Sequence, residues 1–474
     1  MKALIAKRWF KKEDGPPLYV QIADFLGAAI KEGVLPQNSI LPGHRQLAAM
    51  LGVGINTVLH ALHMLEHQNL LVLSERSRPV VAQTSANAPD WDGFISKSAC
   101  SIFEQNFYYF PETRSGTINL SMGLARDYFF RHLFSEVMGS VSFSNEPTSP
   151  YGLPALREKI CENNKPLGID ARPEQVMIVT SVTQALNVIF LSLLGRGSTL
   201  LIAEPNILQV SNLVRATRCA VAGLKMDEFG ITPLSLTKAL QKHGQCVLCV
   251  SPDCNVPTGD VMPAERRRDL LTICNKNRVP VIEHTVFPLK STLSDIPSMK
   301  SMDTTDSVIH LSQVGVSTFT NPWLGWVIMD EVLLRKMQIT RFNFDAHQNF
   351  IMQLAALEIF NNGAYDRHLE HLCRVRLERQ AATSALLEQH LKPYATWNRD
   401  NLDACVWLKF DKTINVARLT DAAADITFQP GALYGQQYQD RVYLSPLAVS
   451  AENYAFGMKA LGNAAAVVRK NAVK

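Results

Sequence analysis

Residues 17–71 read PLYVQIADFLGAAIKEGVLPQNSILPGHRQLAAMLGVGINTVLHALHMLEHQNLL, and this stretch decides the architecture of the amino-terminal end of the chain. Apolar residues recur in it at helical spacing, in runs that include Leu18, Leu47 and Val58. Gly33 and Gly52 end the first two runs, because glycine accommodates the left-handed backbone that closes a helix. The pattern predicts three short helices, the last two joined by a tight turn.

A hairpin with a basic tip is expected after these helices. Leu71–Glu75 and Pro79–Ala82 are typical of short strands, and Arg76, Ser77 and Arg78 join them. Helix, turn, helix and hairpin together form a winged helix-turn-helix, in which the second helix of the pair enters the major groove of DNA and the wing meets the backbone. The first 81 residues hold nine Lys and Arg against six Asp and Glu, so most of the net charge of +4 lies at this end.

The same stretch resembles the helix-turn-helix module of the GntR family along its full length. The resemblance rests on a Pro-Leu-Tyr-x-Gln-Ile opening, a Leu-Pro-x-x-Arg-x-Leu-Ala helix and an x-x-Thr-Val recognition helix. Two departures stand out: Gly43 occupies a position where the family usually has Ser, and Gly54 and Ile55 replace its Ser-Arg pair. Ile55 therefore removes a cation that in the family commonly reaches DNA.

The candidate DNA contacts come from two helices and the wing. By resemblance, Arg45 contacts DNA from the start of the second helix, and its alternative role is that of a solvated surface arginine. Asn56 and Thr57 can hydrogen-bond base edges or phosphates from the start of the third helix, or can simply cap it. The two wing arginines either meet the DNA backbone or are solvated. The predicted DNA-binding residues are Arg45, Asn56, Thr57, His60, Arg76 and Arg78.

From about residue 118 the pattern changes to short apolar runs that alternate with helical stretches. VMIVT (176–180) and CVLCVS (246–251) are near-continuous apolar runs, as expected of parallel strands that are covered on both faces. The alternation predicts an α/β fold, doubly wound with a mostly parallel sheet. Gln353–Leu391 is expected to be largely helical, and Ala404–Leu447 to return to strand and turn.

Length and composition bound the remaining choices. A chain of 474 residues favours several domains, and we expect a DNA-binding domain at 1–83, a linker at 84–117 and a larger domain at 118–474. A net charge of +4 is too small for wholesale coating of nucleic acid. No apolar run reaches the roughly 18 residues of a membrane helix. Nine cysteines without metal-site or disulfide spacing indicate reduced thiols, so we expect a cytoplasmic protein without a metal site.

The larger domain resembles the class I aminotransferase fold, type I of the pyridoxal-phosphate (PLP) enzymes. The resemblance is carried by SPYGLPALREKICENNKPLGIDARPEQVMIVTSVTQAL (149–186), VSPDCNVPTGDVMPAERR (250–267) and VPVIEH (279–284). A GntR head on such a body is the layout of the MocR subfamily of transcriptional regulators, and the resemblance covers nearly the whole chain. It implies a double-stranded DNA operator as partner and a head-to-tail homodimer in which the larger domain dimerises.

The residues that aminotransferases use for chemistry are largely replaced. Such enzymes need a lysine for the Schiff base, a carboxylate beside the pyridine nitrogen and a phosphate cradle. VIHLSQVGVSTFTNPWLGWVI (308–328) matches the family's lysine segment but contains no lysine, and its Lys and Arg positions hold Val316 and Trp323. The family's Asp and Tyr positions hold His284 and Val286. These replacements predict that covalent PLP binding is lost, that no cofactor is used and that the chain is not an enzyme.

Three residues of the family's ligand site remain. Arg441 falls on the arginine that binds an α-carboxylate in the family, Asn255 lies close to the amide near the ring oxygen, and Thr183 with the helix after it is a remnant of the phosphate cradle. The resemblance thus implies a small carboxylate effector. The alternative for Arg441 is a surface ion pair with Asp440, which would contribute little energy.

Two other functions stay open. One is a PLP-dependent aminotransferase, or a PLP-responsive regulator, that uses an unorthodox lysine; the lysines nearest the matched segment are Lys300 and Lys336. The other is a scaffold whose larger domain binds only protein.

Overall fold

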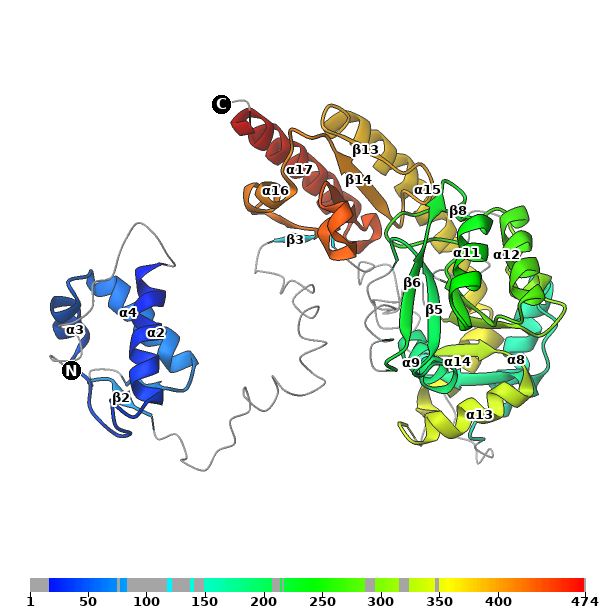
Figure 1. Cartoon of the computed structure of the whole chain (residues 1–474), viewed down its shortest axis with the longest axis horizontal. Coiled ribbons are helices and arrows are strands. Elements are labelled where there is room, and N and C mark those ends of the chain that lie inside the picture. Colours follow the sequence, from blue (N-terminus) through cyan, green and yellow to red (C-terminus); the bar gives the residue numbers. More distant parts are fainter. Residues whose placement is uncertain are drawn as a thin grey trace. The chain divides into compact units, whose positions relative to one another are not determined.

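The computed structural model describes residues 17–74, 77–82, 117–121, 137–139, 149–206, 214, 217–285, 295–314, 324–345 and 349–472. The chain divides into two compact units, residues 1–101 and 102–474 (Figure 1). The predicted linker at 84–117 lies outside the described residues except for its last residue.

The first unit contains the predicted helices. They are α2 (Leu18–Lys31), α3 (His44–Leu51) and α4 (Ile55–His67). α3 and α4 meet at 112°, within the range of helix-turn-helix pairs. Gly52 closes α3 with a φ of +67°, a left-handed conformation that favours glycine.

The predicted wing is present with shorter strands than the sequence suggested. β1 (Leu71–Val72) pairs antiparallel with β2 (Val80–Val81), and Ile40 forms a further bridge to Val80. The helices and the wing share one apolar core, which includes Ile22, Leu26, Leu47, Val58, Leu62, Leu65 and Val81.

The second unit is built on a seven-stranded sheet of the predicted mostly parallel type. β12 alone among these strands runs antiparallel to both of its neighbours. The strands in spatial order are β4 (Val176–Val179), β12 (Gly325–Ile328), β11 (Val308–Gln313), β10 (Val281–His284), β9 (Gln245–Val250), β5 (Ser198–Ala203) and β6 (Ala220–Leu224).

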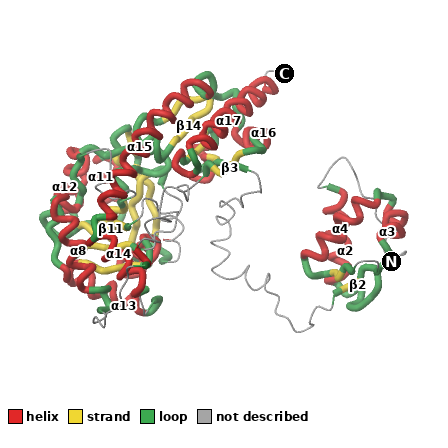
Figure 2. The backbone as a smooth tube through the Cα atoms, turned by 180° about the vertical axis from the view of Figure 1, so that it is seen from behind, coloured by secondary structure: helices red, strands yellow, loops and turns green. Residues whose placement is uncertain are grey.

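Helices cover both faces of this sheet, as the α/β pattern predicts (Figure 2). One face packs on α9 (Val182–Leu193) and α13 (Glu331–Phe342). The other face packs on α8 (Pro154–Asn164), α11 (Pro233–Lys242), α12 (Ala264–Lys276) and α14 (Phe350–Asn361). Two short strands, β7 (Met226–Asp227) and β8 (Gly230–Ile231), form a separate hairpin.

A smaller antiparallel sheet follows the long helix α15 (Ala364–His390). Its strands in order are β13 (Ala395–Trp397), β14 (Val406–Phe410), β17 (Arg441–Leu444) and β16 (Gln429–Pro430). α15 and α17 (Ala451–Ala472) pack on it around a core that includes Leu387, Leu408 and Leu461. β3 (Ile118–Asn119) pairs in parallel with β15 (Ile426–Thr427), and the adjoining Leu120 is fully buried in this core.

The prediction of strand and turn for 404–447 was wrong at one element, α16 (Val416–Ala422). Asn415 caps this helix, because its side-chain oxygen accepts from the amides of Ala417 and Arg418. A helix this short has too few turns to show a clear period in the sequence. The expected largely helical segment at 353–391 is confirmed by α14 and α15.

Candidate functional site

The two helices of the helix-turn-helix pair begin in the same way. Gly43 precedes α3 and Gly54 precedes α4, both with extended backbone, and neither supplies a side-chain cap. The first amides of a helix point outward and carry a partial positive charge, so they attract anions such as phosphates. Both helix starts are therefore suited to the DNA backbone.

The predicted DNA-binding side chains lie on the surface of this unit. Arg45 is exposed in the first turn of α3. On α4, Asn56 and His60 are exposed and Thr57 is half-buried. The His60 ring meets the Tyr19 ring edge to face, with the ring centres 5.8 Å apart. On the wing, Arg78 is exposed, and Arg76 lies outside the described residues.

In the second unit, two neighbouring residues of β10 face opposite sides of the sheet. Glu283 and His284 are consecutive, so their side chains alternate. Both are buried, with exposed fractions of 0 % and 1 %. Ile282, two residues from His284, belongs to the core beneath α9 and α13, which places His284 on that face and Glu283 on the other.

Glu283 is held by a network that the sequence did not reveal. His310 Nδ1 lies 2.9 Å from Glu283 Oε2, and the amides of Met299 and Lys300 donate to the same carboxylate at 2.6 and 3.0 Å. Burial alone would raise the pKa of Glu283, but these hydrogen bonds hold the pKa below its ordinary value. Glu283 is thus a charged anchor on the face away from His284.

His284 has a different environment. Its Nδ1 lies 3.5 Å from Ser251 Oγ at the carboxyl ends of β10 and β9. Burial lowers the pKa of His284 to about 4, so the imidazole is neutral at pH 7. A neutral imidazole cannot supply the negative charge that keeps a pyridine nitrogen protonated.

The start of α9, where a phosphate would bind in the aminotransferase fold, is occupied by side chains of the chain itself. Ser181 Oγ accepts from the Gln184 amide at 3.1 Å, and Gln184 Oε1 accepts from the Thr180 amide at 2.9 Å. Gln184 Nε2 donates to Asp345 Oδ2 at 2.7 Å, which brings a carboxylate beside this turn. Thr183 lies in the first turn, because the helix begins at Val182 and not after Thr183 as expected.

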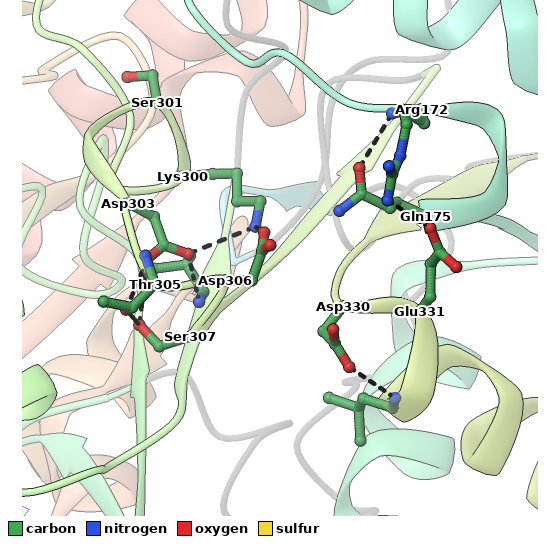
Figure 3. Close-up of polar contacts among 12 residues, drawn as sticks. Arg172, Gln175, Lys300, Ser301, Asp303, Thr305, Asp306, Ser307, Asp330 and Glu331 are labelled. Carbon is green, nitrogen blue, oxygen red and sulfur yellow. Dashed lines mark hydrogen bonds and ion pairs between the residues drawn. The ribbon is translucent and has the colours of Figure 1, made fainter.

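The ammonium group of Lys300 forms ion pairs with two aspartates. Its Nζ lies 3.4 Å from Asp303 Oδ2 and 3.2 Å from Asp306 Oδ1, as Figure 3 shows. Its backbone amide binds Glu283, so Lys300 lies at the opposite face of β10 from His284. The other neighbouring lysine, Lys336, is exposed on α13.

Asn255 and Gln437 both contact the turn after β5. Asn255 is buried, and its Nδ2 donates to Pro205 O at 3.2 Å and to Thr258 Oγ1 at 2.9 Å. Glu204 accepts from Gln437 Nε2 at 2.8 Å. Tyr438, next to Gln437, has a raised pKa, first through burial and then through the Glu204 carboxylate.

The Arg441 guanidinium lies 5.7 Å from the ring centres of both Trp407 and Tyr438. Its Nε lies 3.9 Å from Asp440 Oδ1, and the side chain is 28 % exposed. The Arg441 cation thus lies against two neighbouring aromatic rings at the start of β17, an inner strand of the smaller sheet. Thr183 comes from another part of the larger sheet. It follows β4, whereas Asn255 follows β9, and β9 is the fourth strand along from β4.

Three features of the described residues differ from those that PLP chemistry uses. His284 is neutral, the start of α9 has a carboxylate beside it, and Lys300 lies behind the sheet. Three further positions of the family's cofactor site, Val316, Val286 and Trp323, lie outside the described residues.

The roles of Ser181 and Gln184 could have been found from their spacing, because Ser-x-x-Gln is a capping pattern. Asp345 and His310 gave no sequence signal.

Two kinds of feature are absent from the described residues. No three His, Cys, Asp or Glu residues in that part of the chain are placed to hold a metal ion. No single helix there is long and apolar enough to cross a membrane. The bent pair α3 and α4 reaches the required length and apolar composition only when its two helices are taken together.

Comparison with known proteins agrees with this two-part architecture. Residues 18–81 match the family of bacterial regulatory proteins called gntR, and residues 138–285 match aminotransferase class I and II. The chain is 28 % identical over 471 residues to an uncharacterized HTH-type transcriptional regulator, YdfD, of Bacillus subtilis, covering 95 % of this chain and 97 % of that protein. It is 22 % identical to the HTH-type transcriptional regulator NorG of Staphylococcus aureus, covering 87 % and 96 %.

Solved structures share the fold of the second unit. LysN, an α-aminoadipate aminotransferase from Thermus thermophilus, covers 80 % of this chain and 99 % of its own at 22 % identity, with a TM-score of 0.69. A multiple substrate aminotransferase from Thermococcus profundus covers 81 % and 100 % at 21 % identity, with a TM-score of 0.71. The chain thus joins a helix-turn-helix domain of the gntR family to an aminotransferase class I and II domain, which is the composition of a MocR-type transcriptional regulator.

Proposed function

We propose that the chain is a sequence-specific DNA-binding transcriptional regulator of the cytoplasm. Its second unit forms a homodimer and senses a small carboxylate, without covalent PLP chemistry. The observation that carries the proposal is the pair α3 and α4, which cross at 112° and present uncapped helix starts and exposed polar side chains. Relatives named as transcriptional regulators over nearly the whole length support it.

DNA recognition would use α4 as the helix in the major groove. Asn56 and His60 on its exposed side reach base edges, while Arg45 at the start of α3 and Arg78 on the wing position the unit on the duplex. One such module buries only about 600–1,000 Å² on DNA. A dimer that presents two modules to two half-sites gains both affinity and specificity.

Ligand sensing would use Arg441. A guanidinium pairs with a carboxylate through parallel hydrogen bonds, and the rings of Trp407 and Tyr438 hold the side chain in place. The surface ion pair with Asp440 is long, at 3.9 Å, so it leaves the guanidinium available for such a pair. The effector class that follows is an amino or keto acid.

A PLP-dependent aminotransferase is the second candidate function, because the second unit has that fold. It would need an amine at the face of the sheet that carries His284. Lys300 and Lys336 do not supply it, since Lys300 lies at the other face and Lys336 on the surface of α13. An absorbance band of an internal aldimine that borohydride abolishes would favour the enzyme.

The test of DNA binding is selection of duplexes from a randomised library by the full-length chain. We expect enrichment of a sequence with two related half-sites, whose centres lie one helical turn or a multiple of it apart. Affinity for that sequence should fall steeply with salt, because phosphate contacts release counterions. Failure to enrich any sequence over the unselected library would contradict the proposal.

A further inference from the structure

Ile55 is an apolar residue in an exposed place. It is the first residue of α4, and the residue is 44 % exposed. In contrast, Val58, Leu62 and Leu65 on the same helix are 0–2 % exposed and form its core face. Ile55 therefore contributes little to the core of this unit, and its solvent-facing surface has no covering among the described residues.

The fold also does not require a glycine at position 54, directly before Ile55. Gly54 has a φ of −66°, which every amino acid adopts, and an added Cβ would meet only Thr57 Oγ1, at 3.7 Å. Neither strain nor crowding requires glycine there. A helix start without a side chain instead allows another molecule to approach the backbone closely.

The first turn of α4 offers a particular chemistry to the major groove. Arginine and lysine are the side chains that read guanine, asparagine reads adenine, and aliphatic groups contact the C5-methyl of thymine. None of the first three residues of α4 carries a positive charge; they are Ile55, Asn56 and Thr57. This turn is therefore suited to A·T pairs and lacks a reader of guanine.

We propose that Ile55 reads the methyl group of a thymine in each half-site of the operator. An aliphatic side chain has no hydrogen-bond donor or acceptor, so burial of a methyl group is the base-specific contact it can make in this groove. The inference rests on the proposed DNA-binding function and specifies which base one residue selects.

Uracil substitution tests this contact with the full-length chain and its selected operator. Replacing each thymine singly with uracil removes only the methyl group and leaves base pairing intact. At one thymine per half-site we expect the dissociation constant to rise about fourfold, and about fifteenfold when both half-sites are changed. The remaining thymines should show no comparable effect.

Two variants assign the effect to its residue. Ile55→Ala should show a smaller difference between the thymine and uracil duplexes than the wild type, because most of the aliphatic surface that covers the methyl is gone. Val34→Ala is the matched control, since Val34 is an aliphatic residue of the same unit, 51 % exposed and outside α4. Val34→Ala should keep the sensitivity of the wild type. Ile55→Arg, selected on the same library, should exchange the thymine for guanine.

The outcomes separate the inference from the function beneath it. An operator in which no thymine-to-uracil change weakens binding would overturn the role of Ile55, and so would an Ile55→Ala variant with undiminished sensitivity. In both cases DNA binding itself would stand. A chain that enriches no duplex would contradict the proposed function and the inference together.

Discussion

Gln184 Nε2 donates a hydrogen bond to Asp345 Oδ2 across 2.7 Å, joining the first turn of α9 to the segment just after α13. In an aminotransferase fold the start of this helix is where a phosphate is held. A carboxylate at that place repels an anion, and Ser181 Oγ already accepts from the Gln184 amide. In this chain the turn therefore forms hydrogen bonds within the protein.

Removing the negative charge of Asp345 should increase the affinity of this turn for a phosphate group. Asp345→Asn keeps the shape of the side chain and removes the repulsion, which we expect to strengthen noncovalent binding of PLP by about 1 kcal/mol. Equilibrium dialysis of PLP against both proteins measures the difference. Asp421→Asn, an exposed change on α16, is the control. Equal affinities of Asp345→Asn and wild type would contradict a repulsive role of Asp345.

Arg45→Ala should weaken operator binding by about 1–3 kcal/mol, because an arginine contact to a base or phosphate is lost. Fluorescence anisotropy of the full-length chain on labelled operator measures the loss. Lys412→Ala removes an exposed positive charge from the second unit and should leave affinity unchanged. Unchanged affinity of Arg45→Ala would remove this residue from the DNA interface.

Arg441→Ala should abolish the response to a carboxylate effector. A ligand that binds the folded state raises the melting temperature by mass action. In a panel of amino and keto acids, we expect at least one to raise the melting temperature of the wild type and not that of Arg441→Ala. Arg418→Ala, an exposed change on α16, should respond like the wild type. Equal shifts in wild type and Arg441→Ala across the panel would leave Arg441 as a surface residue.

Acidification should destabilise the second unit through His284. Burial lowers its pKa in the folded state to about 4, whereas the unfolded chain has a pKa near 6.5. Between these values the unfolded state binds the extra proton, so stability falls as pH falls from about 6.5 to about 4, by about 3 kcal/mol in all. Above pH 6.5 this group has no effect.

Urea titrations at several pH values measure that loss. His284→Asn removes the titrating group, so its free energy of unfolding should change less with pH than that of the wild type. Parallel curves for the two proteins between pH 6.5 and pH 4 would show that His284 does not cause the loss.

The elements set by local pattern were predictable, and the contacts between distant segments were not. α3 and α4 follow from their apolar spacing and from Gly52, because turn and helix chemistry act over a few residues. The contact of Glu283 with His310 depends on the register of two parallel strands that are joined by a long crossover. Gln184 and Asp345 are 161 residues apart. No local spacing encodes such pairs.

The candidate site shows the same division. The sequence predicted that His284 replaces the family's carboxylate, and the structure adds that His284 is buried and that burial lowers its pKa. The place of Lys300 depends on the hydrogen bond from its amide to Glu283 of β10, 17 residues earlier in the chain, which the sequence pattern did not show.

Intact mass spectrometry after borohydride reduction tests most directly whether the aminotransferase-like unit works without a covalent cofactor. The full-length protein is purified with excess PLP, reduced and weighed. Because the chain has Val316 at the family's lysine position and Lys300 behind the sheet, we expect the unmodified mass. A single PLP adduct on one lysine of the second unit at near-full occupancy would contradict this account and favour the enzyme.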